Sequence, residues 1–184
     1  MIRLLNVVAI LVAMFGLNAC LISPAPLITP DKAAYPFADG ARLDHVSGDT
    51  HRRVILLREG NYYLHVEDGG PEETPSVLRG MMYEFAPGAF ILQAEIPPEG
   101  DKERAYMYAI LTLDEPRGFK RFDLTCGGVK ELLEGSSQTL KSFGLSEAAS
   151  DSDCMVETLD GLSALAKVVL AKGGEADSTY VPVP

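Results

Sequence analysis

The sequence contains few cysteines, few basic residues and no hydrophobic run of the length that a membrane span requires. Its 184 residues include three cysteines, and 16 Lys and Arg against 26 Asp and Glu give a formal net charge of −10. Three cysteines are too few for a disulfide-dense miniprotein. The acidic excess argues against nucleic-acid binding and against a polybasic contact with anionic lipids. The length suits one folded domain.

The common catalytic and metal-binding motifs are also missing. There is no His-Glu-x-x-His, no Gly-x-Ser-x-Gly and no glycine-rich phosphate loop. Asp44, His45, Asp49 and His51 lie close in sequence and could form a metal site or an acid–base pair. They lack ligand spacing, however, and His65 stands alone. We therefore predict no catalytic residue, no metal site and no cofactor.

The N-terminus has the pattern of a secretory signal. Arg3 is the only charge before Cys20, and Val7 to Leu17 form an apolar run of eleven residues followed by small ones. A permanent membrane span would need about 20 apolar residues. A buried helix of the folded domain is the alternative, which is disfavoured because the run is apolar on every side and lies at the extreme terminus.

The end of the run resembles a motif of a known family. Its four residues are Leu17-Asn18-Ala19-Cys20. They resemble the lipobox of bacterial lipoproteins, from whose commonest pattern only Asn18 departs. The resemblance implies that residues 1–19 are a cleaved signal peptide, that the Cys20 sulfur carries a diacylglyceryl group, and that its new amino group takes a fatty acid such as palmitate. A thiolate is the nucleophile that attacks the lipid donor. An ordinary signal peptide with a cysteine near its end is the alternative.

The residue after Cys20 bears on location. Leu21 stands where an Asp would mark retention in the inner membrane. The resemblance therefore implies export to the outer membrane, with the protein on the periplasmic side. Burial of two or three acyl chains, at about 0.8 kcal/mol per methylene, would hold the protein effectively permanently.

Residues 20–40 are rich in proline. Pro24, Pro26, Pro30 and Pro36 fix the backbone φ and lack a hydrogen-bond donor, which disfavours a helix or a central strand. We predict an extended tether that could hold the domain about 50 Å from the bilayer. The folded domain would then be residues 41–184.

Residues 41–125 predict about seven short strands joined by turns. Gly60 and Gly88 stand at two of these turns and can adopt the positive φ of a tight hairpin. Short connections favour antiparallel neighbours, so we expect a meander that forms either a bent sheet or a small barrel. The expected strands are Arg42–Val46, Val54–Leu57, Tyr62–Val66, Val77–Phe85, Ala89–Ile96, Ala105–Leu113 and Phe119–Thr125.

The C-terminal third predicts helix, which makes the fold class α+β. Apolar residues from Leu159 to Leu170 recur every three or four positions after a possible N-cap at Thr158, and Gly173 suits the helix end. Shorter helical turns are expected around Val129 to Leu133 and before Gly144. Tyr180–Pro184 is expected to be an edge segment, because proline cannot pair on both sides.

Cys126 and Cys154 remain if Cys20 is lipidated. An even count in an oxidising compartment predicts a disulfide between them, which would contribute roughly 3–4 kcal/mol by restricting the unfolded chain. A reactive or metal-binding pair is the alternative, but neither the spacing nor a neighbouring cation supports it.

Acidic residues and tyrosines are further candidates for a binding site. Acidic residues crowd one loop and could bind Ca²⁺ weakly, although a solvated acidic loop is the simpler interpretation. Several tyrosines could line a pocket, or merely fill the sheet surface. The acidic residues are Glu67, Asp68, Glu72 and Glu73, with Asp151 and Asp153 as a second group; the tyrosines are Tyr62, Tyr63, Tyr83, Tyr106 and Tyr108.

Together these features predict a lipid-anchored envelope protein that acts as a non-catalytic binding or interaction module. Its partners would be the membrane, through the anchor, and an envelope protein or a small ligand. A small hydrolase with dispersed catalytic residues and a barrel that binds lipid or another small ligand are the alternatives. A side-chain-filled barrel would favour the interaction module, and a large apolar cavity would favour lipid binding.

Overall fold

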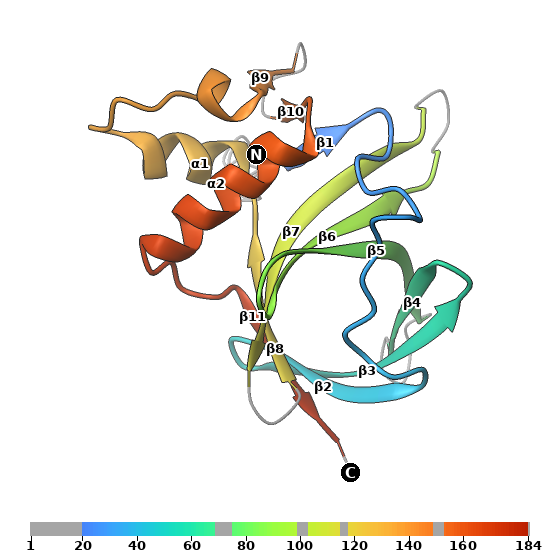
Figure 1. The fold of residues 1–184 in the computed structure, drawn as a ribbon. Coiled ribbons are helices and arrows are strands. Elements are labelled where there is room, and N and C mark those ends of the chain that lie inside the picture. Colours follow the sequence, from blue (N-terminus) through green and yellow to red (C-terminus); the bar gives the residue numbers. More distant parts are fainter. Residues whose placement is uncertain (1–19, 69–74, 99–102, 115–117, 149–152, 184) are drawn as a thin grey trace, which may run out of the picture.

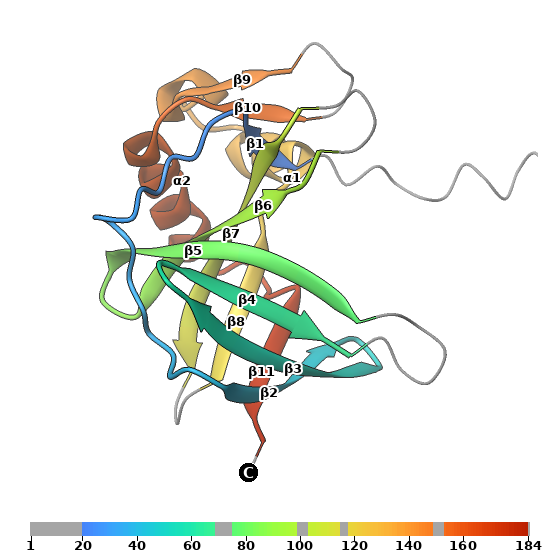
Figure 2. The same ribbon diagram turned by 90° about the vertical axis from the view of Figure 1, so that its right-hand side faces the viewer.

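Eight antiparallel strands close into a barrel at the centre of the fold (Figures 1 and 2). The computed structural model describes residues 20–68, 75–98, 103–114, 118–148 and 153–183. Strands β2 to β8 each pair with the next in sequence, and β11 closes the ring between β8 and β2. The barrel strands are β2 (Ala41–Ser47), β3 (Thr50–Glu59), β4 (Tyr62–Glu67), β5 (Ser76–Ala86), β6 (Ala89–Ile96), β7 (Ala105–Asp114), β8 (Gly118–Asp123) and β11 (Ser178–Pro182).

The seven strands expected between residues 41 and 125 are β2 to β8. Gly60 and Gly88 have φ of 59° and 70° at two of the turns, as tight hairpins require. Of the two expected arrangements, the structure has the barrel. The strand count was too low, because the sheet has eleven strands within the described residues. The strands not foreseen are β1, β9 and β10, each three residues long, and β11 lies in the segment expected at a sheet edge.

The prediction of an edge segment at the C-terminus is wrong. Strand β11 pairs with both neighbours: Tyr180 lies opposite His45 on β2 and opposite Phe119 on β8. Pro182 is tolerated because it lies beyond the last β8 partner and pairs only with β2. At Gly118 an ideal Cβ would lie 2.4 Å from the Tyr180 carbonyl oxygen, so only glycine allows β11 to approach this closely.

A second group of elements packs against one side of the barrel (Figure 1). Strand β1 pairs with β7 at Tyr106 and Met107, where β8 no longer reaches, and β10 runs parallel to β1 on its other side. No helix in the described residues is long and apolar enough to cross a membrane. The elements are β1 (Leu21–Ser23), α1 (Cys126–Leu133), the 3-10 helix η2 (Leu140–Phe143), β9 (Leu145–Glu147), β10 (Cys154–Val156) and α2 (Leu159–Ala171).

The expected helices are present. In α2 the Thr158 side chain accepts a hydrogen bond from the Gly161 backbone N–H, and Gly173 has a φ of 69° just after the end. Helix α1 covers the turn expected near Val129, and η2 ends at Gly144. The apolar side of α2 is buried, because Leu162 and Leu165 have no exposed surface.

Two apolar clusters follow from the alternation of side chains along the strands. Residues that point into the barrel, such as Leu56, Met82 and Leu111, form one cluster. Residues on the outer face of β5 to β7, such as Ile91 and Ile110, belong to the other cluster, together with the helices. Strand β7 is therefore apolar on both faces because both are covered, as its sequence predicted.

The prediction that residues 20–40 form a free tether is wrong, because this segment is part of the fold. Leu21 and Ile28 are fully buried, and Phe37 is 9% exposed. The prolines do not prevent this packing, since the hydrogen bonds are made by residues between them. The folded domain described here therefore begins at residue 20 rather than at residue 41.

The buried side chain of Gln93 fastens this segment to the barrel. Its Oε1 accepts hydrogen bonds from the backbone N–H groups of Leu27 and Ile28, at 2.7 and 2.8 Å. Its amide donates to the Ile28 carbonyl. Ten residues further along, the Tyr63 hydroxyl donates to the Phe37 carbonyl and accepts from the Phe37 N–H. Strands β4 and β6 thus supply side-chain partners that replace strand pairing.

We expect Gly161→Ala to destabilise the protein, because an ideal Cβ there lies 2.1 Å from the backbone oxygen of Phe143. The contact is with backbone, so relief requires α2 and η2 to move apart, at a cost of about 1–3 kcal/mol. Gly127→Ala is the matched control, since Gly127 is also in the first turn of a helix and has no atom within 4 Å of an added Cβ. Urea unfolding of both variants measures the difference, and equal midpoints would contradict the close packing.

Candidate functional site

Cys20 lies at one end of the barrel, fixed between two segments of chain. Its backbone N–H donates to Asp153 Oδ1 at 3.0 Å, and its carbonyl accepts from the Cys154 N–H at 3.2 Å. On the other side it bridges to Thr125, and the Leu21 N–H donates to the Leu124 carbonyl. We call this end of the barrel, where β7 and β11 begin and β8 ends, the Cys20 end.

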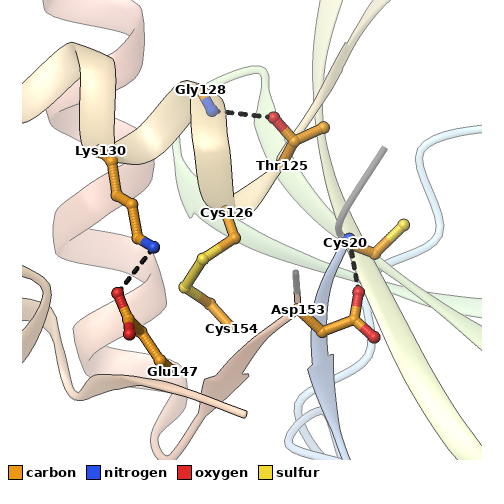
Figure 3. Close-up of a disulfide and its surroundings, with 8 residues drawn as sticks. All are labelled: Cys20, Thr125, Cys126, Gly128, Lys130, Glu147, Asp153 and Cys154. Atoms are coloured by element: carbon orange, nitrogen blue, oxygen red, sulfur yellow. Dashed lines mark hydrogen bonds and ion pairs between the residues drawn. A yellow bond between two sulfur atoms is a disulfide. The ribbon is translucent and has the colours of Figure 1, made fainter. Parts of the chain in front are cut away.

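The Cys20 side chain points away from the disulfide (Figure 3). It borders a pocket of about 160 Å³ that is lined by the barrel residues Leu92, Met107 and Arg121, among others. Burial, and then the charges of Asp153 and Asp123, raise the pKa of the Cys20 thiol, while Arg121 acts in the opposite direction. The folded protein therefore does not present Cys20 as an activated thiolate.

The predicted disulfide is present. Cys126 and Cys154 are bonded, with their Cα atoms 5.2 Å apart. It joins the first residue of α1 to β10, which runs parallel to β1. The bridge therefore holds helix α1 against the strand that borders Cys20 (Figure 3).

A cluster of polar and aromatic side chains lies inside the barrel towards the Cys20 end. His45 Nδ1 is 3.0 Å from Glu67 Oε2, and both side chains are largely buried. The Tyr180 ring lies between those of His45 and Phe119, stacked at centroid distances of 4.5 and 4.1 Å. Arg52 also reaches Glu67, at 3.7 Å. These contacts come from β2, β3, β4, β8 and β11, so only the closed barrel assembles them.

Arg121 adds a largely buried positive charge to this cluster. It pairs with Asp123, with two nitrogens each 2.6 Å from the same carboxylate oxygen, and donates a hydrogen bond to Tyr180. Burial opposes its charge, but Asp123 and Tyr180 outweigh this and raise the pKa of Arg121. Burial is also the main cause of the raised pKa of Tyr180. Arg121 therefore stays positive and Tyr180 protonated.

His65 differs from the other members of the cluster. Burial lowers its pKa to about 4, even though Glu67 opposes this shift. Its Nε2 is buried and has no hydrogen-bond partner within the described structure. It borders the small remaining space in the barrel, about 40 Å³, together with Arg121 and Tyr180. His65 is therefore a neutral ring whose polar atom faces a space that suits a few water molecules at most.

The candidate metal or acid–base site at Asp44, His45, Asp49 and His51 is not assembled in the structure. Side chains alternate between the two faces of a strand, which places these residues on different sides of the sheet or in a turn. His51 pairs with Asp44 at 3.1 Å on the outer surface, whereas His45 points into the barrel. Asp49 lies in the β2–β3 turn. No group of three or more potential metal ligands occurs in the residues that the structure describes. Of the acidic loop, Glu72 and Glu73 lie outside the described residues, as does Asp151 of the second group.

The five tyrosines do not share a pocket either. Tyr63 is buried and bonds to Phe37, while Tyr108 lies on the outer face, where its hydroxyl is 2.6 Å from Ser23 Oγ. Burial raises the pKa of Tyr108 to about 12. Tyr62 lies under the guanidinium of Arg79. These tyrosines pack the sheet and hold residues 20–37 against it.

The opposite end of the barrel carries a larger and more open groove, of about 630 Å³. Residues 36–38, the first residues of β2, the end of β7 and residues 182–183 line it. Leu113, in this groove, is 45% exposed, and Val181 beside it is 52% exposed. The part of β7 that lines the Cys20 pocket is Met107 to Ala109, and Leu113 in the groove is four to six residues further along the strand, so the groove and Cys20 are about 13–20 Å apart along the strands.

Sequence reasoning missed Gln93, Arg121 and Tyr180, which are central in the structure. Gln93 was visible as a polar residue within an apolar strand, which is the signal of a buried side chain with a defined partner. Arg121 and Tyr180 gave no such signal, because their partners depend on the closure of the barrel by β11. The predicted signal peptide, residues 1–19, lies outside the described residues.

No family model matches this chain, and neither the curated proteins nor the solved structures include a similar one. The arrangement of side chains must therefore indicate the function. Within the described residues, the His45 ring is held by Glu67 and Tyr180 and has no hydroxyl or thiol bonded to it. The polar cluster is thus largely paired internally.

We expect the protein to lose stability as the pH falls from about 6.5 to about 4, because His65 takes up a proton over this range only when unfolded. Below pH 4 both states are protonated and the loss levels off. Its size is on the order of 2–3 kcal/mol. Denaturant unfolding of the protein and of His65→Gln at several pH values isolates this contribution. His51→Gln, at an exposed ring, is the control and should keep the original slope; a similar slope in His65→Gln would show that His65 titrates normally.

Proposed function

We propose that this protein is a lipid-anchored, non-catalytic binding module of the bacterial cell envelope, attached through Cys20 to the outer membrane on the periplasmic side. The position of Cys20 is the observation that carries the proposal. The residue that the lipobox resemblance selects lies at the end of the barrel, with its side chain beside a surface pocket rather than in the core. A bulky group on its sulfur is compatible with the fold.

The packing of residues 20–40 changes what the anchor would do. A free tether would let the domain move far from the bilayer. Strand β1 and the Gln93 hydrogen bonds instead hold residues 21–28 against the barrel, so this segment cannot serve as an extended spacer. The barrel itself would then be the spacer. Its far end, with the open groove, would stand about 13–20 Å from the anchored residue, since Leu113 is four to six residues along β7 from the part that lines the Cys20 pocket.

The filled barrel supports binding rather than catalysis or lipid transport. Leu56, Met82 and Leu111 occupy its interior beside a space of about 40 Å³, and the pocket at the Cys20 end adds about 160 Å³. Transport of a lipid would need a cavity of several hundred Å³. The exposed Leu113 and Val181 beside the groove offer apolar surface of the kind that protein contacts cover. We therefore infer that the partner is an envelope protein that contacts the groove end.

We expect Cys20→Ala to abolish incorporation of labelled palmitate and to release the protein from the membrane fraction, because the thiol is the acceptor of the lipid. The double variant Cys126→Ala/Cys154→Ala is the control: it retains Cys20 and should retain the label. Labelling followed by fractionation measures both. Unchanged labelling of Cys20→Ala, or loss of label in the control alone, would overturn the anchor.

We expect a photo-crosslinking residue at Leu113 to give a discrete adduct with one envelope protein in intact cells. The same residue at Glu175, which is exposed and lies after α2, should not give this adduct. Mass spectrometry identifies the captured protein and the site. Equal capture at both positions, or none at Leu113, would show that the groove end is not the contact.

A further inference from the structure

The pocket beside Cys20 has the size of a lipid linker rather than of a lipid. Its volume is about 160 Å³. At about 30 Å³ for each group the size of a water molecule, it has room for roughly five such groups. The three carbons of a glyceryl group and its first ester atoms would fill it. An acyl chain would not fit and would have to leave through the open side.

The lining of the pocket combines apolar side chains, hydrogen-bond donors and two carboxylates. Apolar side chains such as Ala94 and Met107 form one part, and Arg121 and Thr125 provide donors. The Thr125 hydroxyl oxygen accepts from the Gly128 N–H, which leaves its proton available. Glycerol esters have carbonyl oxygens as acceptors and an apolar carbon backbone. The two carboxylates already accept hydrogen bonds within the protein: Asp123 Oδ1 accepts from Arg121, and Asp177 Oδ2 accepts from the Asp123 backbone N–H.

The backbone of Cys20 fixes where a substituent on its sulfur must begin. Hydrogen bonds through the Cys20 nitrogen and oxygen, at 3.0 and 3.2 Å, hold it against Asp153 and Cys154. A group bonded to the sulfur therefore starts at the wall of the pocket. Its local concentration there is that of an intramolecular ligand, so even weak contacts would keep it bound.

From these observations we propose that the pocket beside Cys20 holds the glyceryl ester portion of the lipid on that cysteine, so that the Cys20 end of the barrel lies on the bilayer surface. The inference rests on the proposed function, because it requires lipidated Cys20. It adds a binding site within the protein for the anchor and a fixed orientation. The acyl chains leave the pocket at the Cys20 end and enter the bilayer there, and the groove end points away from it.

Methionine labelling tests the pocket. From Cys20 onwards the chain has four methionines, at positions 81, 82, 107 and 155, and of these only Met107 lines the pocket. We expect the methyl resonance of Met107 to shift between the lipidated protein in nanodiscs and Cys20→Ala, and to show contacts with glyceryl protons. Met155 pairs with Ile22 on β1 and is the control close to Cys20. No shift at Met107, or an equal one at Met155, would exclude the pocket.

Fluorescence quenching tests the orientation, because the chain has no tryptophan. Val77 is 61% exposed near the start of β5, at the Cys20 end, and Leu113 is 45% exposed at the other. In lipidated protein on phosphatidylcholine vesicles with brominated acyl chains, Val77→Trp should lose fluorescence and Leu113→Trp should not. Equal or reversed quenching in protein that floats with the vesicles would overturn the orientation alone. Protein that does not float would overturn the anchor, and this inference with it.

Discussion

The insertion of β1 between β7 and β10 is the constraint on which the arrangement of this protein depends. Three residues of strand, Leu21 to Ser23, connect the barrel on one side to the disulfide-linked β10 on the other. Leu21 and Ile28 are fully buried, and each such side chain contributes roughly 1.5–3 kcal/mol. The Gln93 hydrogen bonds add to this, since a buried Gln without partners would be costly. A group attached at Cys20 is thereby attached rigidly to the whole fold.

The closed barrel makes this attachment directional. A barrel has no free sheet edges, so its ends are the places where strands stop and loops or pockets can form. One end carries Cys20 and its pocket, and the other carries the groove with Leu113. Between them the interior is filled, with Tyr180 stacked between His45 and Phe119. The barrel is therefore a filled body between the Cys20 end and the groove end, and in the proposed function it would connect the two.

The parts of the fold that were predictable are those whose signal is local. Strands β2 to β8 have β-prone runs, with glycine at two of their turns, and α2 has an N-cap residue and a stripe of apolar residues. Cys126 and Cys154 are the two cysteines that remain if Cys20 is lipidated. Strands β1, β9 and β10 are three residues long, too short for any periodicity to register. The prolines of residues 20–40 suggested a free chain, but proline excludes only regular pairing. It does not exclude packing in which a distant side chain, here Gln93, supplies the partners.

The same distinction applies to the candidate site and to its contact with a membrane. Arg121, Asp123 and Tyr180 meet only because β11 closes the ring, so their relation is long-range and invisible in the sequence. The net charge, by contrast, follows directly from the composition. At a formal net charge of −10, an anionic leaflet repels this protein over a Debye length of about 8–10 Å. Broad adsorption of its surface is therefore unfavourable, so the proposed membrane attachment depends on the attraction that a covalent lipid would supply. In the proposed orientation only the Cys20 end of the barrel would contact the bilayer, because a lipid on the rigidly held Cys20 would fix the position of that end.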